Sequence, residues 1–188
     1  AEIITDRTSL VSVMHANNET GTVENIPALS AVARERGVLF HTDAVQSIGK
    51  IKVDVAELGV DMLSLTAHKI YGPKGIGALY IRQGVKITPL LYGGSHEKRR
   101  RPGTENVALA VGLGRALEVA EERGEKDHAE MTKLADYFIE KVTAAIPDVR
   151  FNGSRQQRIP QTVNLSFEGI EGESIVLSLD MKGVAVSA

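Results

Sequence analysis

The sequence contains no cysteine and no tryptophan, and aromatic residues make up only 4% of its 188 residues. Without cysteine the chain can form neither a disulfide bond nor a thiolate metal site. No apolar run has the length needed to span a membrane, and residues 1–7 lack the basic and apolar regions of a signal peptide. A net charge of −2 gives no strong field for nucleic acid or anionic lipid. We therefore expect a cytoplasmic protein that binds neither a membrane nor nucleic acid directly.

The composition is that of a folded protein, with 43% hydrophobic and 24% charged residues. This length can bury one substantial core, or form one and a half domains. The chain starts without methionine and stops within the apolar run 184–188, so we expect it to be a segment of a longer protein. The composition becomes charged around Arg123–Asp127, where we predict a hinge between residues 1–124 and residues 125–188.

The first part alternates short apolar runs with helical patterns, which is typical of an α/β fold with a mostly parallel sheet and helices on both faces. Strands are predicted at residues 10–14 and 78–81 and in two central apolar runs, 37–46 and 61–69, each of which ends in a polar cluster. A short helix should begin near Pro27 and end at Gly37, and a brief crossover should cover residues 53–58. The fold class predicted for residues 1–124 is therefore part of an α/β domain.

The first part should end in a helix for which Thr104 is a candidate N-cap. The second part predicts the beginning of a small α+β domain, whose first helix should place residues between Met131 and Ile146 on one apolar face. Alternation at residues 163–167 predicts a strand, residues 173–181 predict a helix, and residues 184–186 predict the start of another strand.

Polar side chains follow both central apolar runs. Asp43 and Gln46 come after the first, and Thr66, His68 and Lys69 come after the second. Ligands bind at the carboxyl ends of parallel strands, so we expect these groups to converge. A lysine able to form an imine and an aspartate able to pair with a pyridinium nitrogen suit pyridoxal phosphate chemistry. Taken alone, Lys69 would more often be a solvated lysine, and Asp43 would more often cap a turn.

Several other polar residues have two interpretations each. Asn18 could approach the phenolic oxygen of such a cofactor or simply form a turn, and chemistry alone does not separate it from Asn17. His15 and His41 have no spacing that forms a metal triad, so packed or solvent-facing histidines are favoured. The glycine-rich residues 72–77 match a phosphate loop only loosely, and the basic run at 98–101 is typical of a solvated loop.

Four motifs occur in order: HANNETG, HTDAVQSIGK, SLTAHKIYGPKGIGALY and RRRPGTENV. Together they resemble the group I cysteine desulfurases of the NifS and IscS type, which are pyridoxal-phosphate enzymes of aminotransferase class V. The resemblance covers nearly the whole chain. It implies a fold-type I cofactor domain and an enzyme that takes sulfur from L-cysteine, releases alanine and passes persulfide sulfur to an iron–sulfur scaffold or another acceptor protein.

The resemblance also implies roles for individual residues. Lys69 matches the catalytic lysine that holds the cofactor, and Asp43 matches the partner of the pyridine nitrogen. The remaining cofactor contacts that it implies are Gln46 and Asn18 near the phenolic oxygen and Thr66 and His68 at the phosphate. Thr104 matches a threonine that reaches the phosphate in the other subunit, so a homodimer with shared active sites is expected.

Some features of the family are missing from this sequence. The nucleophilic cysteine of the family would follow residues 183–187, and its substrate-binding arginine and its amino-terminal part have no counterpart here. Other interpretations stay open: a selenocysteine lyase or another class V aminotransferase, a non-catalytic scaffold of the same fold, or a doubly wound nucleotide-binding module.

Overall fold

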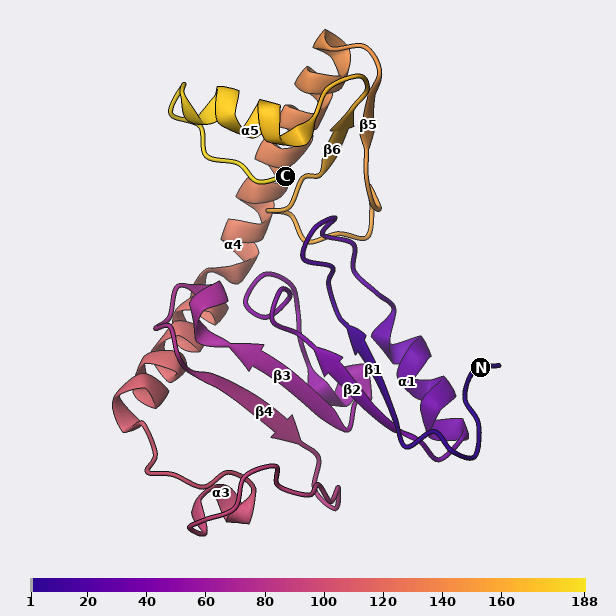
Figure 1. The fold of residues 1–188 in the computed structure, drawn as a ribbon, viewed down its shortest axis with the longest axis vertical. Coiled ribbons are helices and arrows are strands. Elements are labelled where there is room, and N and C mark those ends of the chain that lie inside the picture. Colours follow the sequence, from indigo (N-terminus) through magenta and orange to yellow (C-terminus); the bar gives the residue numbers. More distant parts are fainter. Residues whose placement is uncertain (1) are drawn as a thin grey trace.

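The computed structural model describes residues 2–188 as a four-stranded sheet with flanking helices, followed by a two-stranded sheet (Figure 1). The helices are α1 (Ile26–Glu35), α2 (Val55–Leu58), the 3₁₀ helix η1 (Ala67–Ile70), α3 (His96–Arg99), α4 (Val107–Ala145) and α5 (Gly172–Asp180). The strands are β1 (Leu10–Met14), β2 (Leu39–Asp43), β3 (Met62–Thr66), β4 (Gly77–Ile81), β5 (Val149–Phe151) and β6 (Leu165–Phe167). The long helix α4 connects the two sheets (Figure 1).

The large sheet has the strand order β1-β2-β3-β4. Strands β1, β2 and β3 run parallel, and β4 is antiparallel to β3. The prediction that the two central apolar runs form parallel strands is confirmed, with Asp43 paired with Ser64. The predicted α/β class with a mostly parallel sheet is confirmed as well. The carboxyl ends of the three parallel strands consequently share one edge of the sheet.

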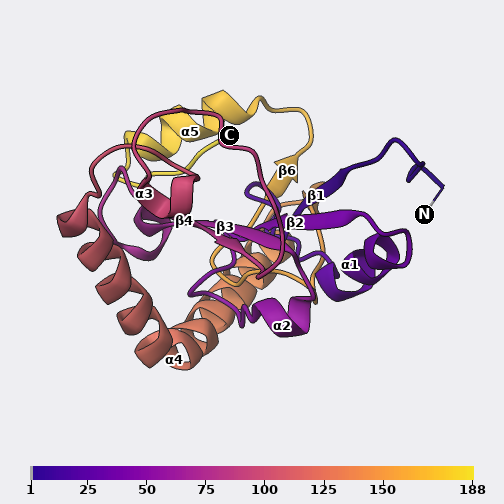
Figure 2. The ribbon, with the colours of Figure 1, turned by 90° about the horizontal axis from the view of Figure 1, so that it is seen from below.

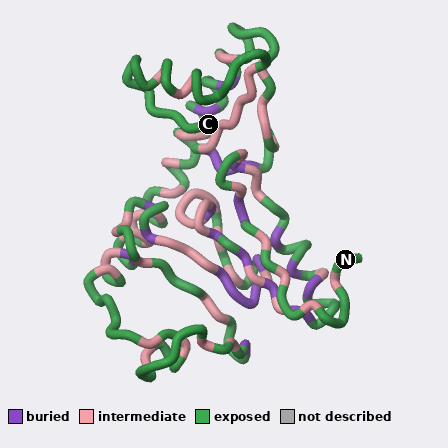
Figure 3. The backbone as a smooth tube through the Cα atoms, viewed as in Figure 1, coloured by how far each residue is buried: buried purple, intermediate pink, exposed green. Residues whose placement is uncertain are grey.

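One face of the large sheet packs against α1 and α2 (Figure 2). Phe40 and Leu63 face this way, and they form a cluster with Ile26 and Ala33 of α1 and Leu58 of α2. Burial of such apolar surface is the main stabilising contribution to the fold. The opposite face of β1 carries Leu10, Ser12 and Met14, which are exposed. In Figure 3 the buried segments of the first part of the chain are coloured purple along the strands and α1.

Asp61 holds β2, β3 and the end of β4 together. Its buried carboxylate accepts a hydrogen bond from the Phe40 backbone N–H at 2.7 Å and pairs with Arg82 beyond β4. A buried carboxylate needs partners of this kind because its loss of hydration is otherwise uncompensated.

Helix α1 begins and ends where the sequence predicts. The Asn25 side chain accepts a hydrogen bond from the Ala28 N–H, and Pro27 occupies the first turn, where no backbone N–H is required. Gly37 follows the helix with φ of +68°, a left-handed conformation that glycine adopts without steric cost.

Helix α4 differs from the prediction in two ways. Its N-cap is Asn106, whose side chain accepts from the Leu109 N–H, so the assignment of Thr104 as the cap is wrong. It also runs for 39 residues without a break across the stretch Arg123–Asp127, where two separate helices were expected. Pairs at i,i+4, such as Arg123–Asp127, support the helix there. The division into residues 1–124 and 125–188 stays a prediction.

The second half of α4 buries a narrower face than predicted. Ala135 and Ile139 are buried, whereas Leu134 and Phe138 are exposed. Beyond Pro147, β5 pairs antiparallel with β6, and the strand predicted at residues 163–167 is confirmed over its last three residues. The helix predicted at residues 173–181 is α5, but residues 184–186 form no strand, since no neighbouring strand pairs with them among the described residues.

Candidate functional site

The polar clusters after β2 and β3 lie at the same edge of the sheet. The backbone N–H of Ala44, directly after Asp43, donates to the Ser64 carbonyl at 2.9 Å, so the two strands stay paired to their ends. The exposed carboxylate of Asp43 accepts a hydrogen bond from the Val45 N–H at 2.8 Å. This contact caps the following turn and leaves the second carboxylate oxygen available for a ligand.

Lys69 lies in η1, which continues directly from β3. Ala67 and Ile70 of η1 are buried against α4, so the helix turns His68 and Lys69 outward. Tyr71 ends η1 in a left-handed conformation, with φ of +62°. Lys69 lines a cavity of about 810 Å³ together with Lys50. A lysine in a cavity at a sheet edge can react with a carbonyl group of a bound molecule.

Helix α4 forms a wall of this cavity, and other parts of the chain complete it. The further lining residues include Gly72 and Pro73 after η1, Arg115 and Ala116 on α4, and Pro160 from the second part of the chain. Asp43, Gln46, Thr66 and His68 are not among the described lining residues. These four residues lie at the carboxyl ends of β2 and β3 or just beyond them. Of the predicted site residues, only Lys69 lines the cavity.

Thr66 and His68 form a hydrogen-bonded pair. The Thr66 hydroxyl lies 2.9 Å from His68 Nδ1 and 3.2 Å from the Ile76 carbonyl oxygen. The carbonyl oxygen can only accept, so the hydroxyl donates its proton to Ile76 and accepts the Nδ1–H of His68. His68 is exposed, so an anion such as a phosphate can reach it.

Gln46 lies in the turns that follow Asp43, and its amide contacts a residue that the sequence interpretation missed. The Lys50 ammonium donates a hydrogen bond to Gln46 Oε1 at 3.3 Å. Burial, and secondarily the charge of Lys69, lower the pKa of Lys50 below its ordinary value. The spacing of four residues between Gln46 and Lys50 was the signal available in the sequence.

The loop after β1 distinguishes the two asparagines. Asn17 Oδ1 accepts from the backbone N–H groups of Glu19 and Thr20 at 2.9 and 2.8 Å, so its side chain shapes the loop. Asn18 is exposed, and its amide makes no hydrogen bond within residues 2–188. Asn18 is therefore the asparagine of this pair with a side chain free to meet a ligand.

Thr104 is exposed in the connection between α3 and α4, and it does not line the cavity beside Lys69. Its expected role toward a second subunit stays a prediction.

The histidines form no candidate metal site. The His41 imidazole lies 2.8 Å from the hydroxyl of Ser12 and 2.8 Å from that of Ser64, and burial lowers its pKa while the nearby Asp43 raises it. His15 is buried, and its pKa is also lowered by burial. No group of three His, Cys, Asp or Glu side chains suited to a metal occurs in residues 2–188, and no described helix is long and apolar enough to cross a membrane.

Backbone hydrogen bonds join the loop that carries Asn18 to residues 157–162 in the second part of the chain. We call this contact, between residues 21–23 and 157–162, the seam. The Ile159 N–H donates to the Gly21 carbonyl at 2.8 Å, and the Val23 N–H donates to the Gln157 carbonyl at 2.9 Å. A Cβ on Gly21 would lie 2.8 Å from the Thr162 side chain, so only glycine allows this close approach.

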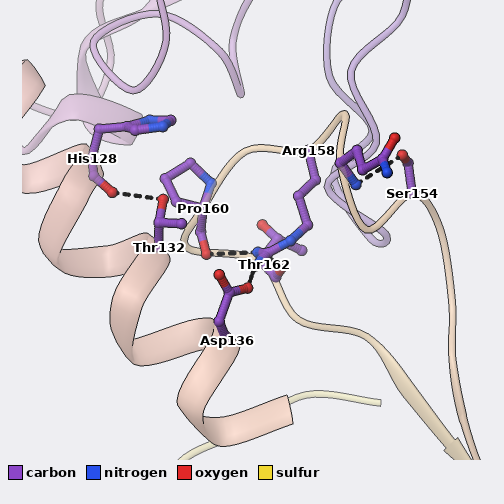
Figure 4. A network of polar contacts seen from close by, with 8 residues as sticks. His128, Thr132, Asp136, Ser154, Arg158, Pro160 and Thr162 are labelled. Carbon is purple, nitrogen blue, oxygen red and sulfur yellow. Dashed lines mark hydrogen bonds and ion pairs between the residues drawn. The ribbon is translucent and has the colours of Figure 1, made fainter. Parts of the chain in front are cut away.

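Arg158 holds the seam against α4 (Figure 4). Its side chain is only 5% exposed, and it donates to the Asp136 carboxylate at 2.7 Å and to the Pro160 carbonyl at 3.1 Å. Figure 4 shows the guanidinium between α4 and the loop of Pro160 and Thr162. Nothing in the local sequence around Arg158 indicated this contact, because its partner lies on a distant element.

The comparisons with known proteins agree with this arrangement. The family model of class V aminotransferases matches residues 1–188, and the chain therefore belongs to the aminotransferase class V family. A cysteine desulfurase IscS from Dictyoglomus turgidum is 56% identical over 180 residues, covering 96% of this chain and 46% of that protein. A cysteine desulfurase IscS from Methanosarcina thermophila is 50% identical over 184 residues, covering 98% of this chain and 45% of that protein. The chain thus spans about half the length of the curated relatives it matches.

Two solved structures have folds that match nearly the whole of this chain. A NifS-like protein has a TM-score of 0.94 at 36% identity, covering 100% of this chain and 51% of that one. A NifS-like protein from Rickettsia africae has a TM-score of 0.90 at 29% identity, covering 96% and 50%. The predicted resemblance to class V aminotransferases, and within them to the NifS and IscS type, is confirmed as a similarity.

Proposed function

We propose that this chain is the cofactor-bearing segment of a cysteine desulfurase, which uses pyridoxal phosphate to take sulfur from L-cysteine and leaves L-alanine. The observation that carries the proposal is the position of Lys69, in a cavity at the sheet edge where the strand of Asp43 also ends. Similarity to proteins named cysteine desulfurase, at about half identity over most of this chain, supports the same activity.

The donor set at the sheet edge fits pyridoxal phosphate. An aldehyde requires an amine, a pyridinium nitrogen requires a carboxylate, and a phosphate requires donors, and Lys69, Asp43 and the Thr66–His68 pair supply these groups. When bound, pyridoxal phosphate supplies an electron-withdrawing ring that stabilises negative charge at the substrate Cα. The chain's own residues have to bind that ring, orient it and move protons beside it.

Each of these residues then has a definite task. The Lys69 amine would hold the cofactor aldehyde and would move the substrate Cα proton. The Asp43 carboxylate would hold a proton on the pyridine nitrogen. Gln46 and Asn18 offer amide N–H groups to the phenolic oxygen of the ring.

The sulfur-accepting thiol must come from outside this sequence, because the sequence contains no cysteine. Further parts of the proposal are a homodimer in which Thr104 reaches the cofactor phosphate of the other subunit, delivery of sulfur to an iron–sulfur scaffold or another acceptor protein, and a cytoplasmic location. These parts depend on the family resemblance.

Incubation of the whole protein with L-cysteine and a thiol reductant tests the activity. We expect alanine and sulfide in equal amounts from the wild-type protein and none from Lys69→Ala, because the amine that binds the cofactor is gone. Lys74→Ala is the matched control, since Lys74 is an exposed lysine of the following loop and should keep the activity. Transfer of an amino group to an oxo acid would instead indicate an aminotransferase, and release of alanine only from L-selenocysteine would indicate a selenocysteine lyase. Absence of both turnover and cofactor absorbance would indicate a scaffold.

A further inference from the structure

Lys50 is held in place by two separate contacts. Its backbone carbonyl lies 3.1 Å from His128 Nδ1 on α4, and its N–H donates to the Ser47 carbonyl at 3.0 Å. The turns of residues 44–51 thereby fix the backbone of Lys50 four residues after Gln46. From this anchored backbone the Lys50 ammonium reaches the Gln46 side chain.

The contact between Lys50 and Gln46 also determines the orientation of an amide. A lysine ammonium has three donors and no acceptor, so the Gln46 atom facing it must be Oε1. The Nε2 group of Gln46 consequently points away from Lys50, with its two N–H groups free to donate. Without Lys50, the two orientations of the amide would differ little in energy.

The surroundings of Lys50 make this contact stronger than a surface contact. Lys50 is half-buried and lines the same cavity as Lys69. A hydrogen bond from a charged donor is about twice as strong as one between neutral groups, and partial burial reduces its screening by water. Burial, and secondarily the charge of Lys69 in the same cavity, lower the pKa of Lys50.

We propose that Lys50 is a positioning residue, which turns the amide donors of Gln46 toward the phenolic oxygen of the cofactor bound at Lys69. The inference rests on the proposed function, since it assigns Gln46 to that oxygen. It adds a residue that contacts Gln46 and not the cofactor.

A double-mutant cycle on the cofactor-free whole protein tests the proposal, with the dissociation constant for pyridoxal phosphate as the readout. We expect Lys50→Met to weaken binding about three- to tenfold, the range of one net hydrogen bond. Lys50→Arg keeps a charged donor and should remain within about twofold of the wild type. In a Gln46→Leu background, Lys50→Met should have no further effect, because the residue through which it acts is absent.

Lys52→Met serves as the matched control, since Lys52 is an exposed lysine two positions after Lys50 and pairs with Glu57. It should leave the dissociation constant unchanged. An equal effect of Lys50→Met in both backgrounds, or no effect in either, would overturn the proposal. Thermal unfolding of each variant identifies any loss of affinity that comes from misfolding.

A second measurement separates this inference from the proposed function. The side-chain amide of Gln46 can be observed by nuclear magnetic resonance in the cofactor-free protein. Its proton resonances should be displaced from those of a freely reorienting glutamine amide in the wild type and in Lys50→Arg, and should shift toward those values in Lys50→Met as the amide loses its fixed orientation. If the wild-type protein binds no pyridoxal phosphate, the proposed function fails, while this measurement still decides whether Lys50 orients Gln46. Unchanged resonances in Lys50→Met would refute the inference.

Discussion

Replacing Arg158 by methionine should loosen the seam that supports the Asn18 loop. The substitution keeps an unbranched side chain of similar length but removes the donors to Asp136 and to the Pro160 carbonyl. Pro160 is buried, so its carbonyl loses its partner at a cost of about 1–3 kcal/mol. Asp136 is 52% exposed and recovers water, so its loss is smaller. The sum is about 3 kcal/mol of local stability.

Amide hydrogen exchange is the direct assay for this loss. The Val23 and Ile159 N–H groups donate across the seam, and a loss of about 3 kcal/mol corresponds to exchange on the order of 100-fold faster at these two amides. Amides in the centre of β2 should change much less, because their opening does not involve the seam.

A matched control comes from α4, the helix that carries Asp136. Arg123 pairs with Asp127 at 3.5 Å, and both side chains are exposed to a considerable degree. Arg123→Met should therefore cost less than about 1 kcal/mol and leave exchange at Ile159 unchanged. The reasoning is refuted if Arg158→Met accelerates exchange at Ile159 by less than threefold, or if the two variants have equal effects.

Three further predictions concern stability. Gly77→Ala should lower the free energy of unfolding by about 1–3 kcal/mol, because a Cβ would lie 2.6 Å from the Leu65 carbonyl oxygen. Gly114 lies on open helix surface, so Gly114→Ala should raise the free energy of unfolding by about 0.5–1 kcal/mol. Urea titration measures both changes, and changes of the same sign would contradict the packing argument. Asn106→Ala should cost about 1 kcal/mol by removing the cap of α4, while a loss below 0.3 kcal/mol on urea unfolding would exclude that role. Burial lowers the pKa of His15 below 6.5, so the unfolded chain binds the proton more readily and the free energy of unfolding falls as the pH drops below that value. His15→Gln should reduce this fall between pH 7.5 and 5.5. An unchanged dependence of the free energy of unfolding on pH would argue against this role of His15.

The sequence predicts the sheet edge well because its signals are local. The apolar runs of β2 and β3 are too short for helices; Asp43 is the last residue of β2, and Lys69 lies three residues after β3. Short parallel strands place such residues at one edge without any knowledge of tertiary contacts. The α/β class and the grouping of the polar clusters could therefore be predicted from the sequence.

Other features depend on contacts between distant residues. Arg158 meets Asp136 on a separate element, and Lys50 gains its importance from a cavity that α4 encloses. The charged stretch around Arg123 suggested a break, but its charges pair along the helix at i,i+4 and extend α4. The three residues of β5 form a strand only because β6 pairs with them, so their own sequence carries little signal.

The covalent position of the cofactor is the most direct test of the central claim. The whole protein is incubated with pyridoxal phosphate, reduced with borohydride and digested, and the modified peptide is identified by mass spectrometry. The proposal predicts one phosphopyridoxyl group per chain on Lys69, with Lys50 unmodified although it lines the same cavity. Modification of Lys50 in place of Lys69, or label spread over exposed lysines, would contradict it.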